Sequence, residues 1–388
     1  MHFDTEVVHG GQHPDKLHRA ISPPIYQTST FAFEDADQGA RLFKREEKGH
    51  IYTRLSNPTI DLLARKVARL ESAEAGLLFS SGLSAIFNTI VTLVKSGEEI
   101  VSDDTIYGGT FALLKNIIPR LGIGVKFIDA TDYDRLKNEI TEKTKLLFIE
   151  TPANPTLKII DISACAEIAK QKKIPLCVDN TFATPYLQRP IEHGANIVVH
   201  SATKYLGGHG DIIGGVVVGA KEFIERLWDD AKEIGACNSP FNAWLILRGL
   251  KTLTVRMDKH CSNAMKIAEF LTGHPQVERV YYPGLKDHPG FDIARRQMSQ
   301  FGGMLGFDLK GGKEAGKRVM NSVKLCTIAV SLGDVDTLIE HPASMTHSTY
   351  SDEELKKCGI NPGYVRVSVG IENPDDLIDD LKQALAKI

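Results

Sequence analysis

The sequence predicts an α/β protein with a mainly parallel, seven-stranded sheet covered on both faces, followed by a smaller α+β domain. Between residues 75 and 220, short apolar and β-branched segments alternate with helical segments, which is typical of a parallel sheet. Polar residues follow several of these segments, at the carboxyl ends where such sheets bind ligands. A helical region over 240–274 then leads to a second group of strands.

Residues 1–50 are expected to form an irregular arm, because paired glycines and prolines interrupt every regular pattern there. A long arm of this kind usually packs against another part of the assembly, often a second subunit. The large domain, 51–245, begins with a helix for which Asn57 is the expected cap and Pro58 the first residue.

Seven strands are predicted in the large domain from their short apolar runs. They lie at 76–79, 100–101, 125–128, 146–149, 176–178, 197–199 and 215–218, with helices that include 83–95 and 161–172. The smaller domain, 246–388, is predicted to have strands near 277–282, 304–309, 325–330 and 365–369 and a final helix over 375–387.

The composition is that of an ordinary globular protein, with 42% hydrophobic and 24% charged residues. The 46 basic and 49 acidic residues give a net charge of −3 without a long basic run, which argues against a nucleic-acid partner. Six scattered cysteines form no zinc or redox motif and suit a reducing cytoplasm. No apolar run has membrane-spanning length, and histidines such as His341 and His347 show no paired ligand spacing. We therefore expect a cytoplasmic protein without a metal or a membrane partner.

Lys204 follows a predicted buried strand and lies between hydroxyl residues and a run of glycines. Desolvation there would lower the pKa of its amine and make it nucleophilic toward a carbonyl group. The alternative is a lysine that reaches water past a glycine-rich turn. Asp179 ends the preceding strand, where it would either cap the following turn or pair with a protonated ring nitrogen of a cofactor.

Three other positions have a functional and a structural interpretation each. The turn at Ser80, Ser81 and Gly82 precedes a helix and would either hold a phosphate or be an ordinary turn. Tyr107, before two glycines, would stack on a flat ring or simply begin a helix. Arg366 alternates with valines and would be exposed or bind a carboxylate. Together with Lys204 and Asp179, these residues are what pyridoxal phosphate catalysis on an amino acid requires.

The ordered motifs of the chain resemble, over nearly its whole length, the cystathionine/methionine metabolism family of pyridoxal-phosphate enzymes. The motifs are YTRLSNPT at 52–59, SSG at 80–82, YGGT at 107–110, PANP at 152–155, VDNT at 178–181, SATKY at 201–205 and VRVS at 365–368. The resemblance implies the aspartate-aminotransferase fold type, fold type I.

The resemblance also implies a role for each matching residue. Lys204 matches the Schiff-base lysine, Asp179 the partner of the pyridine nitrogen, and Tyr107 the stacking residue and proton donor. The phosphate is expected at Ser81, Gly82, Leu83, Ser201 and Thr203; Asn154, Ser331 and Arg366 match contacts to the substrate carboxylate and to cofactor oxygens. Tyr52 and Arg54 match residues that reach the phosphate of a neighbouring subunit, which implies a dimer with shared sites, usually paired into a homotetramer.

Within this family, the segments 329–334 and 341–347 are most similar to the methionine γ-lyases. Cystathionine-processing members generally carry a glutamate where this chain has Val330, and an apolar side chain suits a thioether. Many methionine γ-lyases have a cysteine where this chain has Gly109, and the segment 232–237 also departs from their usual pattern. The resemblance thus implies α,γ-elimination of L-methionine, and also of homocysteine, to a thiol, 2-oxobutanoate and ammonia. The alternatives are a cystathionine γ-lyase and a cystathionine γ-synthase.

A nicotinamide oxidoreductase would be a different class of enzyme. The glycines at 207–210 and 214–215 lack the G-x-G-x-x-G spacing between an early strand and a helix, which disfavours that class.

Overall fold

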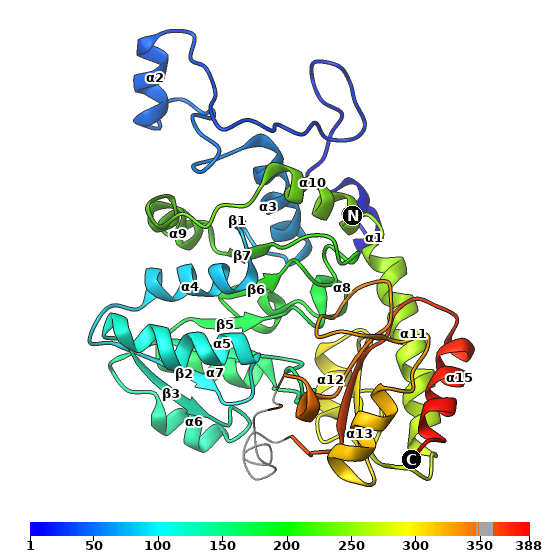
Figure 1. Cartoon of the computed structure of the whole chain (residues 1–388). Helices are drawn as coiled ribbons and strands as arrows, with labels where there is room; N and C mark the ends of the chain where they lie inside the picture. The colour runs from blue at the N-terminus through cyan, green and yellow to red at the C-terminus, as the bar shows by residue number, and fades with distance from the viewer. Residues whose placement is uncertain (347, 349–359) are drawn as a thin grey trace.

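The computed structural model describes residues 1–346, 348 and 360–388 and contains two sheets with helices packed around them (Figure 1). The large sheet has seven strands in the order β1-β7-β6-β5-β4-β2-β3. They are β1 (Ala75–Phe79), β2 (Glu99–Asp103), β3 (Gly124–Ile128), β4 (Thr144–Glu150), β5 (Leu176–Asp179), β6 (Ile197–Ser201) and β7 (Gly215–Gly219). β7 runs antiparallel to both of its neighbours, β1 and β6, and the other six strands all run in one direction. The predicted seven-stranded, mainly parallel sheet is therefore confirmed.

Both faces of the large sheet are apolar, because successive side chains of a strand point to opposite sides. Ile100 and Leu146 pack on one face against α4 (Gly82–Leu93) and α9 (Lys221–Ile234). Val101 and Leu147, the next residues along the same strands, pack on the other face against α6 (Tyr133–Glu139) and α7 (Ile162–Gln171). Burial on both faces leaves the strand ends as the place where polar side chains can gather.

The remaining helices of this part of the chain are mostly short. They are α3 (Pro58–Leu70), α5 (Gly108–Ala112), a π-helical turn (Leu113–Ile117), α8 (Thr184–Leu187), α10 (Pro240–Leu250), α11 (Leu253–Thr272) and 3₁₀ turns at Ile118–Leu121 and Pro190–His193. Asn57 Oδ1 accepts the N–H of Thr59 at 3.0 Å and Pro58 is the first residue of α3, as predicted. The helical region expected over 240–274 is two helices.

The second sheet has the order β10-β11-β12-β9-β8. Its strands are β8 (Val277–Tyr281), β9 (Met304–Leu309), β10 (Thr327–Ile328), β11 (Leu338–Glu340) and β12 (Tyr364–Ser368), accompanied by α12 (Phe291–Gln297), α13 (Gly312–Met320), a 3₁₀ turn (Pro342–Ser344) and α15 (Pro374–Leu385). The strand predicted over 325–330 is only two residues long, because Leu325 and Ile328 are exposed and have no core to pack against. β11 was not predicted, since three residues are too few to show a period.

The prediction of a wholly irregular arm is wrong, because the arm contains α1 (Phe3–His9) and α2 (Ala36–Phe43). Val7 of α1 is buried in the core that contains α3. The side chain of Asp35 caps α2 by accepting the N–H of Gln38 at 2.7 Å, and α2 projects away from the rest of the chain (Figure 1). Each of these short helices depends on one cap or one buried contact. Such a feature is not visible in a sequence whose pattern is interrupted by glycines and prolines.

The boundaries predicted for the large and small domains stay a prediction, and the one between 245 and 246 falls inside α10. Across the described residues, no helix is both long enough and apolar enough to cross a membrane. The same residues contain no group of three or more His, Cys, Asp or Glu arranged to hold a metal. His347 and Cys358 lie outside the described residues.

Candidate active site

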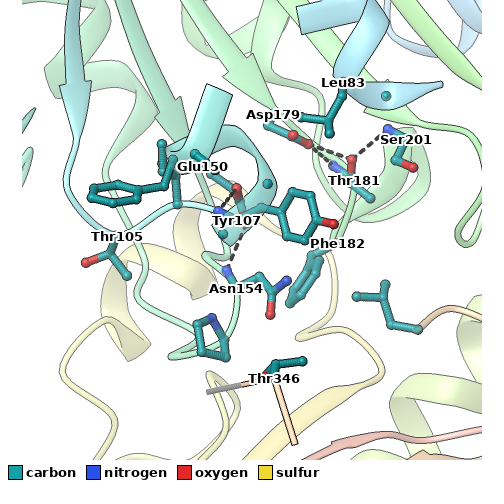
Figure 2. A pocket seen from close by; sticks show the side chains of 18 of the residues that line it. Leu83, Thr105, Tyr107, Glu150, Asn154, Asp179, Thr181, Phe182, Ser201 and Thr346 are labelled. Carbon is teal, nitrogen blue, oxygen red and sulfur yellow. Dashed lines mark hydrogen bonds between the residues drawn. The ribbon is translucent and has the colours of Figure 1, made fainter. Parts of the chain in front are cut away.

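A cavity of about 1330 Å³ opens at the carboxyl ends of the parallel strands and extends to the second sheet. All but two of the predicted site residues line it: Ser81, Gly82, Leu83, Tyr107, Gly109, Asn154, Asp179, Ser201, Thr203, Lys204, Val330, Ser331 and Arg366. Figure 2 shows side chains from several elements pointing into this space. The exceptions, Tyr52 and Arg54, are not among its lining residues.

Lys204 lies in the turn after β6, and its Nζ donates to Ser331 Oγ at 2.9 Å. Burial lowers the pKa of Lys204 to about 8, and the positive charge of Arg366 contributes to this lowering. The structure thus supports a desolvated amine over a lysine that reaches water. The hydroxyl that contacts the amine comes from the loop between β10 and β11 of the second sheet, whereas Thr203 Oγ1 accepts the N–H of Gly214 at 3.1 Å.

Asp179 is buried at the end of β5, and its Oδ1 accepts the Thr181 N–H at 3.0 Å and the Thr181 hydroxyl at 2.6 Å. The Thr181 hydroxyl oxygen also accepts the N–H of Ser201 at 2.9 Å, so this carboxylate is fixed through the start of the Lys204 turn (Figure 2). Asp179 therefore does cap a turn, as one interpretation required, and it also lines the cavity, as the other required. Thr181 was not assigned a role from the sequence.

Glu150 is a second buried carboxyl group, paired in register with Asp179 on the neighbouring strand. Burial, followed by the charge of Asp179, raises the pKa of Glu150 well above its ordinary value. Its Oε2 accepts the Tyr107 N–H at 2.7 Å and its Oε1 accepts the Asn154 N–H at 2.8 Å. Glu150 thus holds two cavity loops together. Its place at the end of an apolar strand was the available signal, but sequence reasoning assigned it no role.

The N-terminus of α4 meets the end of β6 in the cavity. Ser81 caps the helix through its Oγ, which accepts the Ser84 N–H at 3.2 Å. A Cβ atom on Gly82 would lie 2.9 Å from Ser201 Cβ, so the close approach of the two segments requires a glycine. The first N–H groups of a helix have no partner within the helix and attract anions. This arrangement fits a phosphate.

Arg366 is buried in β12 and points into the cavity, which rules out the interpretation as an exposed arginine. Its Nη1 donates to Asn154 Oδ1 at 2.8 Å and lies 3.2 Å from Glu340 Oε1. Its Nη2 donates to the carbonyl oxygens of Val330 and Ser331, both at 3.0 Å. The guanidinium is therefore held in one orientation by Asn154, which follows a strand of the large sheet, and by residues 330, 331 and 340 from the region of the second sheet. Glu340 was missed because β11 was not predicted.

The outer part of the cavity contains the more exposed candidates. The side chains of Tyr107 and Val330 are 47% and 57% exposed. A Cβ atom on Gly109 would lie 2.4 Å from Tyr107 Cε1, so the present position of the ring depends on this glycine. Cys237 is exposed in the segment that departs from the methionine γ-lyase pattern.

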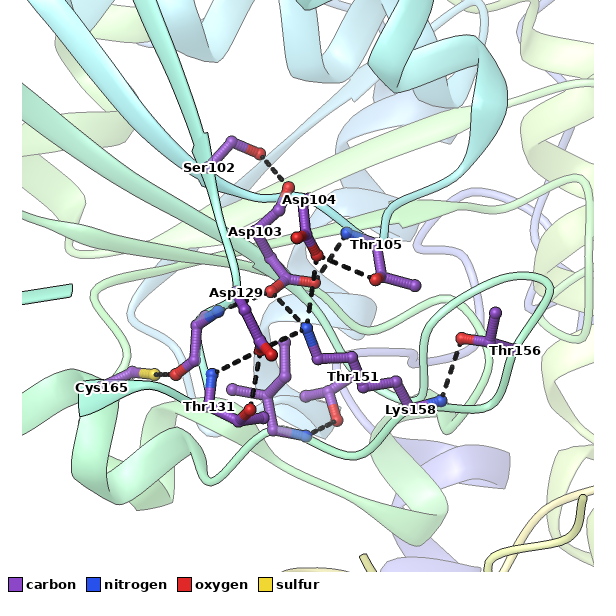
Figure 3. A network of polar contacts seen from close by, with 12 residues as sticks. Ser102, Asp103, Asp104, Thr105, Asp129, Thr131, Thr151, Thr156, Lys158 and Cys165 are labelled. Carbon is purple, nitrogen blue, oxygen red and sulfur yellow. Dashed lines mark hydrogen bonds and ion pairs between the residues drawn. The ribbon is translucent and has the colours of Figure 1, made fainter. Parts of the chain in front are cut away.

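A polar network at the edge of the cavity was also missed (Figure 3). Lys158 Nζ lies 2.8 Å from Asp103 Oδ1 and 2.7 Å from Asp129 Oδ1, and Asp104 is 3.5 Å away. Although burial opposes it, these carboxylates raise the pKa of Lys158. The network ties the ends of β2 and β3 to the loop that follows Asn154 and so fixes one wall of the cavity.

The geometry of the cavity fits pyridoxal phosphate at the three groups by which this cofactor is held. There is a helix N-terminus for the phosphate, a buried carboxylate for the ring nitrogen and a desolvated amine for the aldehyde. The fold and the site therefore define a pyridoxal-phosphate-dependent enzyme of fold type I.

The family model described as Cys/Met metabolism PLP-dependent enzyme matches residues 4–386, and the chain belongs to this family. The L-methionine γ-lyase of Fusobacterium nucleatum subsp. nucleatum is 51% identical over 387 residues, covering 99% of this chain and 98% of the relative. The cystathionine β-lyase of Coxiella burnetii is 48% identical, with coverage of 99% and 98%. The crystal structure of metB from Corynebacterium glutamicum has a TM-score of 0.93 and 44% identity, and covers 100% of this chain and 98% of that one.

Proposed function

We propose that this enzyme catalyses the α,γ-elimination of L-methionine, which with water yields methanethiol, 2-oxobutanoate and ammonia, and that it also accepts homocysteine. The observation that carries the proposal is Val330, which lines the cavity beside Ser331 and Lys204. An apolar side chain offers no partner for a distal ammonium group but suits a thioether. The similarity to L-methionine γ-lyases over nearly the full chain supports the same substrate.

The cofactor would be held at three points by residues of this chain. The N–H groups of Gly82 and Leu83 and the hydroxyls of Ser81, Ser201 and Thr203 would bind its phosphate, Asp179 its ring nitrogen, and Lys204 its aldehyde carbon. When bound, pyridoxal phosphate supplies an electron sink that stabilises negative charge on the substrate carbon next to it. Tyr107 would lie against its ring.

The side chains then have separate tasks in the reaction. Arg366, Asn154 and Ser331 would bind the substrate α-carboxylate and fix the orientation of the Cα–H bond. The Lys204 amine, with its pKa lowered to about 8 by burial, would take the Cα proton, release that proton again, and, once neutral, take a Cβ proton. The Tyr107 hydroxyl would give a proton to the departing thiolate. Glu150 and Thr181 position these groups through the contacts described above.

The association of subunits is part of the same proposal. Tyr52 and Arg54 lie outside the cavity lining of their own chain, which is consistent with a contribution to the phosphate site of a second copy. Large apolar side chains of the arm are exposed, with Leu17 at 81% and Ile21 at 80%. We infer a homotetramer built as a dimer of dimers, in the cytoplasm, where the unpaired thiols would stay reduced. Sedimentation equilibrium tests the tetramer, and a monomer with full activity would contradict it.

A substrate panel tests the function. Release of 2-oxobutanoate is measured at equal concentrations of L-methionine, L-homocysteine and L-cystathionine, and O-acylhomoserine is added with cysteine to detect a synthase. We expect methionine to be the better substrate, and Val330→Glu to shift kcat/KM toward cystathionine by about tenfold or more, the effect expected of a close pair of opposite charges. The Lys204→Ala variant is the inactive control.

The second candidate function is that of a cystathionine γ-lyase or γ-synthase. The similarity to a cystathionine β-lyase, which also acts on cystathionine, supports this candidate. A wild-type enzyme that prefers cystathionine over methionine would favour this candidate and contradict the proposal.

A further inference from the structure

Glu340 is a buried carboxylate that no step of the proposed reaction uses. It lies in β11 directly opposite Arg366 of β12, is only 4% exposed and lines the cavity. Its Oε1 is 3.2 Å from Arg366 Nη1, and among the described residues its buried Oε2 has no hydrogen-bond partner. A carboxylate thus already lies against the guanidinium to which a substrate carboxylate would bind.

The donors of Arg366 leave little room for a second carboxylate. Nη2 is occupied by two carbonyl oxygens, and Nη1 is shared between Asn154 and Glu340. Nε is the guanidinium nitrogen that lacks a hydrogen-bond partner in the described part of the chain. A bidentate carboxylate takes two adjacent N–H groups of the guanidinium fork. Either such pair includes at least one nitrogen that already has a partner, so one partner must yield.

We propose that Glu340 is a built-in competitor of the substrate carboxylate: it occupies Arg366 in the free enzyme and yields, taking a proton from solvent, when an amino acid binds. The inference rests on the proposed role of Arg366 in substrate binding. Two carboxylates beside one guanidinium in a buried site cannot both keep their charge without cost, and the usual relief is protonation of one. Glu340 therefore acts on the substrate through Arg366 and makes substrate affinity depend on pH.

The surroundings of Glu340 allow this change of charge. The titratable groups around it are Arg366 and Tyr364 of β12, Lys204 from the turn after β6, and its neighbour His341. Burial raises the pKa of Glu340, although Arg366 and Lys204 both favour its charged form. If a substrate carboxylate neutralises Arg366, the protonated form becomes the favoured one. Proton uptake and binding are then linked.

Binding of L-norleucine to the holoenzyme tests the proposal, because norleucine has the length of methionine but no thiolate to lose. Calorimetric titration at pH 8 in two buffers of different ionisation enthalpy gives both the Kd and the number of protons taken up. We expect Glu340→Gln to bind norleucine about fivefold or more tightly, within the usual range of coupling between sites. The variant should also take up fewer protons than the wild type.

The matched control ligand is 3-(methylthio)propylamine, which has the amine and the thioether but no carboxylate. Its affinity and proton uptake should be the same in wild type and Glu340→Gln. Equal norleucine affinity and equal proton uptake in the two proteins would overturn the proposal. Weaker norleucine binding by the variant would also overturn it, because Glu340 would then only hold Arg366 in place.

Two further measurements test the competition if the Glu340→Gln variant does not fold or has no effect. If Glu340→Gln does not fold, the wild type alone is titrated from pH 6 to 9, and identical proton uptake for norleucine and the amine contradicts the proposal. The Arg366→Ala variant separates the proposed role of Arg366 in binding the substrate carboxylate from the proposed competition by Glu340. If it does not weaken norleucine relative to the amine, the proposed carboxylate site itself fails. If it does and Glu340→Gln has no effect, the competition alone fails.

Discussion

Gly109 lies beneath the ring of Tyr107, where a side chain would collide with it. We predict that Gly109→Ala displaces the ring, because a Cβ atom there would lie 2.4 Å from Tyr107 Cε1. The ring is half exposed and can turn aside, so the protein should fold normally while kcat/KM on methionine falls by about tenfold or more, as expected when a catalytic group is displaced by about 1 Å. The measurement is steady-state kinetics together with a thermal unfolding curve.

Gly108→Ala is the control for this prediction, because a Cβ atom on Gly108 would have nothing within 4 Å. Its activity should stay close to that of the wild type. Equal losses in the two variants would show that helix α5, and not the tyrosine ring, is what the substitutions disturb.

Single side chains were predictable where their neighbours in sequence define their surroundings. Lys204, Asp179 and Arg366 follow or lie within apolar strands, and the structure places all three in the cavity. Glu340 and Thr181 were not assigned roles, because their importance comes from partners on other strands. The hydrogen bond from Lys204 to Ser331 joins residues 127 apart, and nothing in either local sequence indicates that pairing.

At the scale of elements, α4 has both a structural and a binding task. We predict that Ser81→Ala lowers the free energy of unfolding by about 1 kcal/mol, because the capped N–H of Ser84 loses its partner. The affinity for pyridoxal phosphate should also fall, because its phosphate would lose the Ser81 hydroxyl and the helix end that would bind it becomes less ordered. Denaturant unfolding and cofactor titration measure the two effects.

Asp132→Ala provides the comparison, because Asp132 caps the remote helix α6 by accepting the N–H of Arg135 at 3.0 Å. It should cost a similar free energy of unfolding and leave cofactor affinity unchanged. A Ser81→Ala variant with undiminished cofactor affinity would contradict the assignment of the α4 terminus to the phosphate.

The predictable elements are those with a long, one-sided or fully buried pattern. Residues 146–149 of β4 and 197–199 of β6 are uninterrupted apolar runs, and α3 has both a cap and a proline at its start. The arm helices, β10 and β11 are short and depend on single contacts. Elements this short contain too few residues to show a helical or strand period, so they leave no periodic trace in the sequence.

At the scale of the whole molecule, acid should loosen the junction between the two sheets. His260 of α11 is fully buried, its Nδ1 is 2.6 Å from the Val369 carbonyl oxygen, and its ring packs edge-on against Tyr205 with 5.2 Å between centroids. Burial lowers the pKa of His260 to about 4, whereas an unfolded histidine has a pKa of about 6.5. The unfolded chain therefore binds the extra proton first as the pH falls.

It follows that the contribution of His260 to stability is complete above about pH 6.5 and is lost as the pH falls toward about 4. The loss from this residue should be at most about 3 kcal/mol. Denaturant unfolding of the wild type and of His260→Asn at pH 7 and pH 5 measures it. We expect the variant to lose less stability between the two values, and parallel losses would exclude His260 as the cause.

The contact between Arg366 and Asn154 joins residues 212 positions apart, and this has a consequence for how the enzyme matures during synthesis. The residues proposed to hold the phosphate, the ring nitrogen and the aldehyde of the cofactor within one chain have all left the ribosome soon after Lys204, whereas Arg366 emerges more than 160 residues later. Domains generally fold as units, beginning with the N-terminal one. A nascent chain would thus be able to take up pyridoxal phosphate before it can recognise an amino acid. During synthesis, the cofactor site would then exist without Arg366, the residue that would select a substrate by its carboxylate.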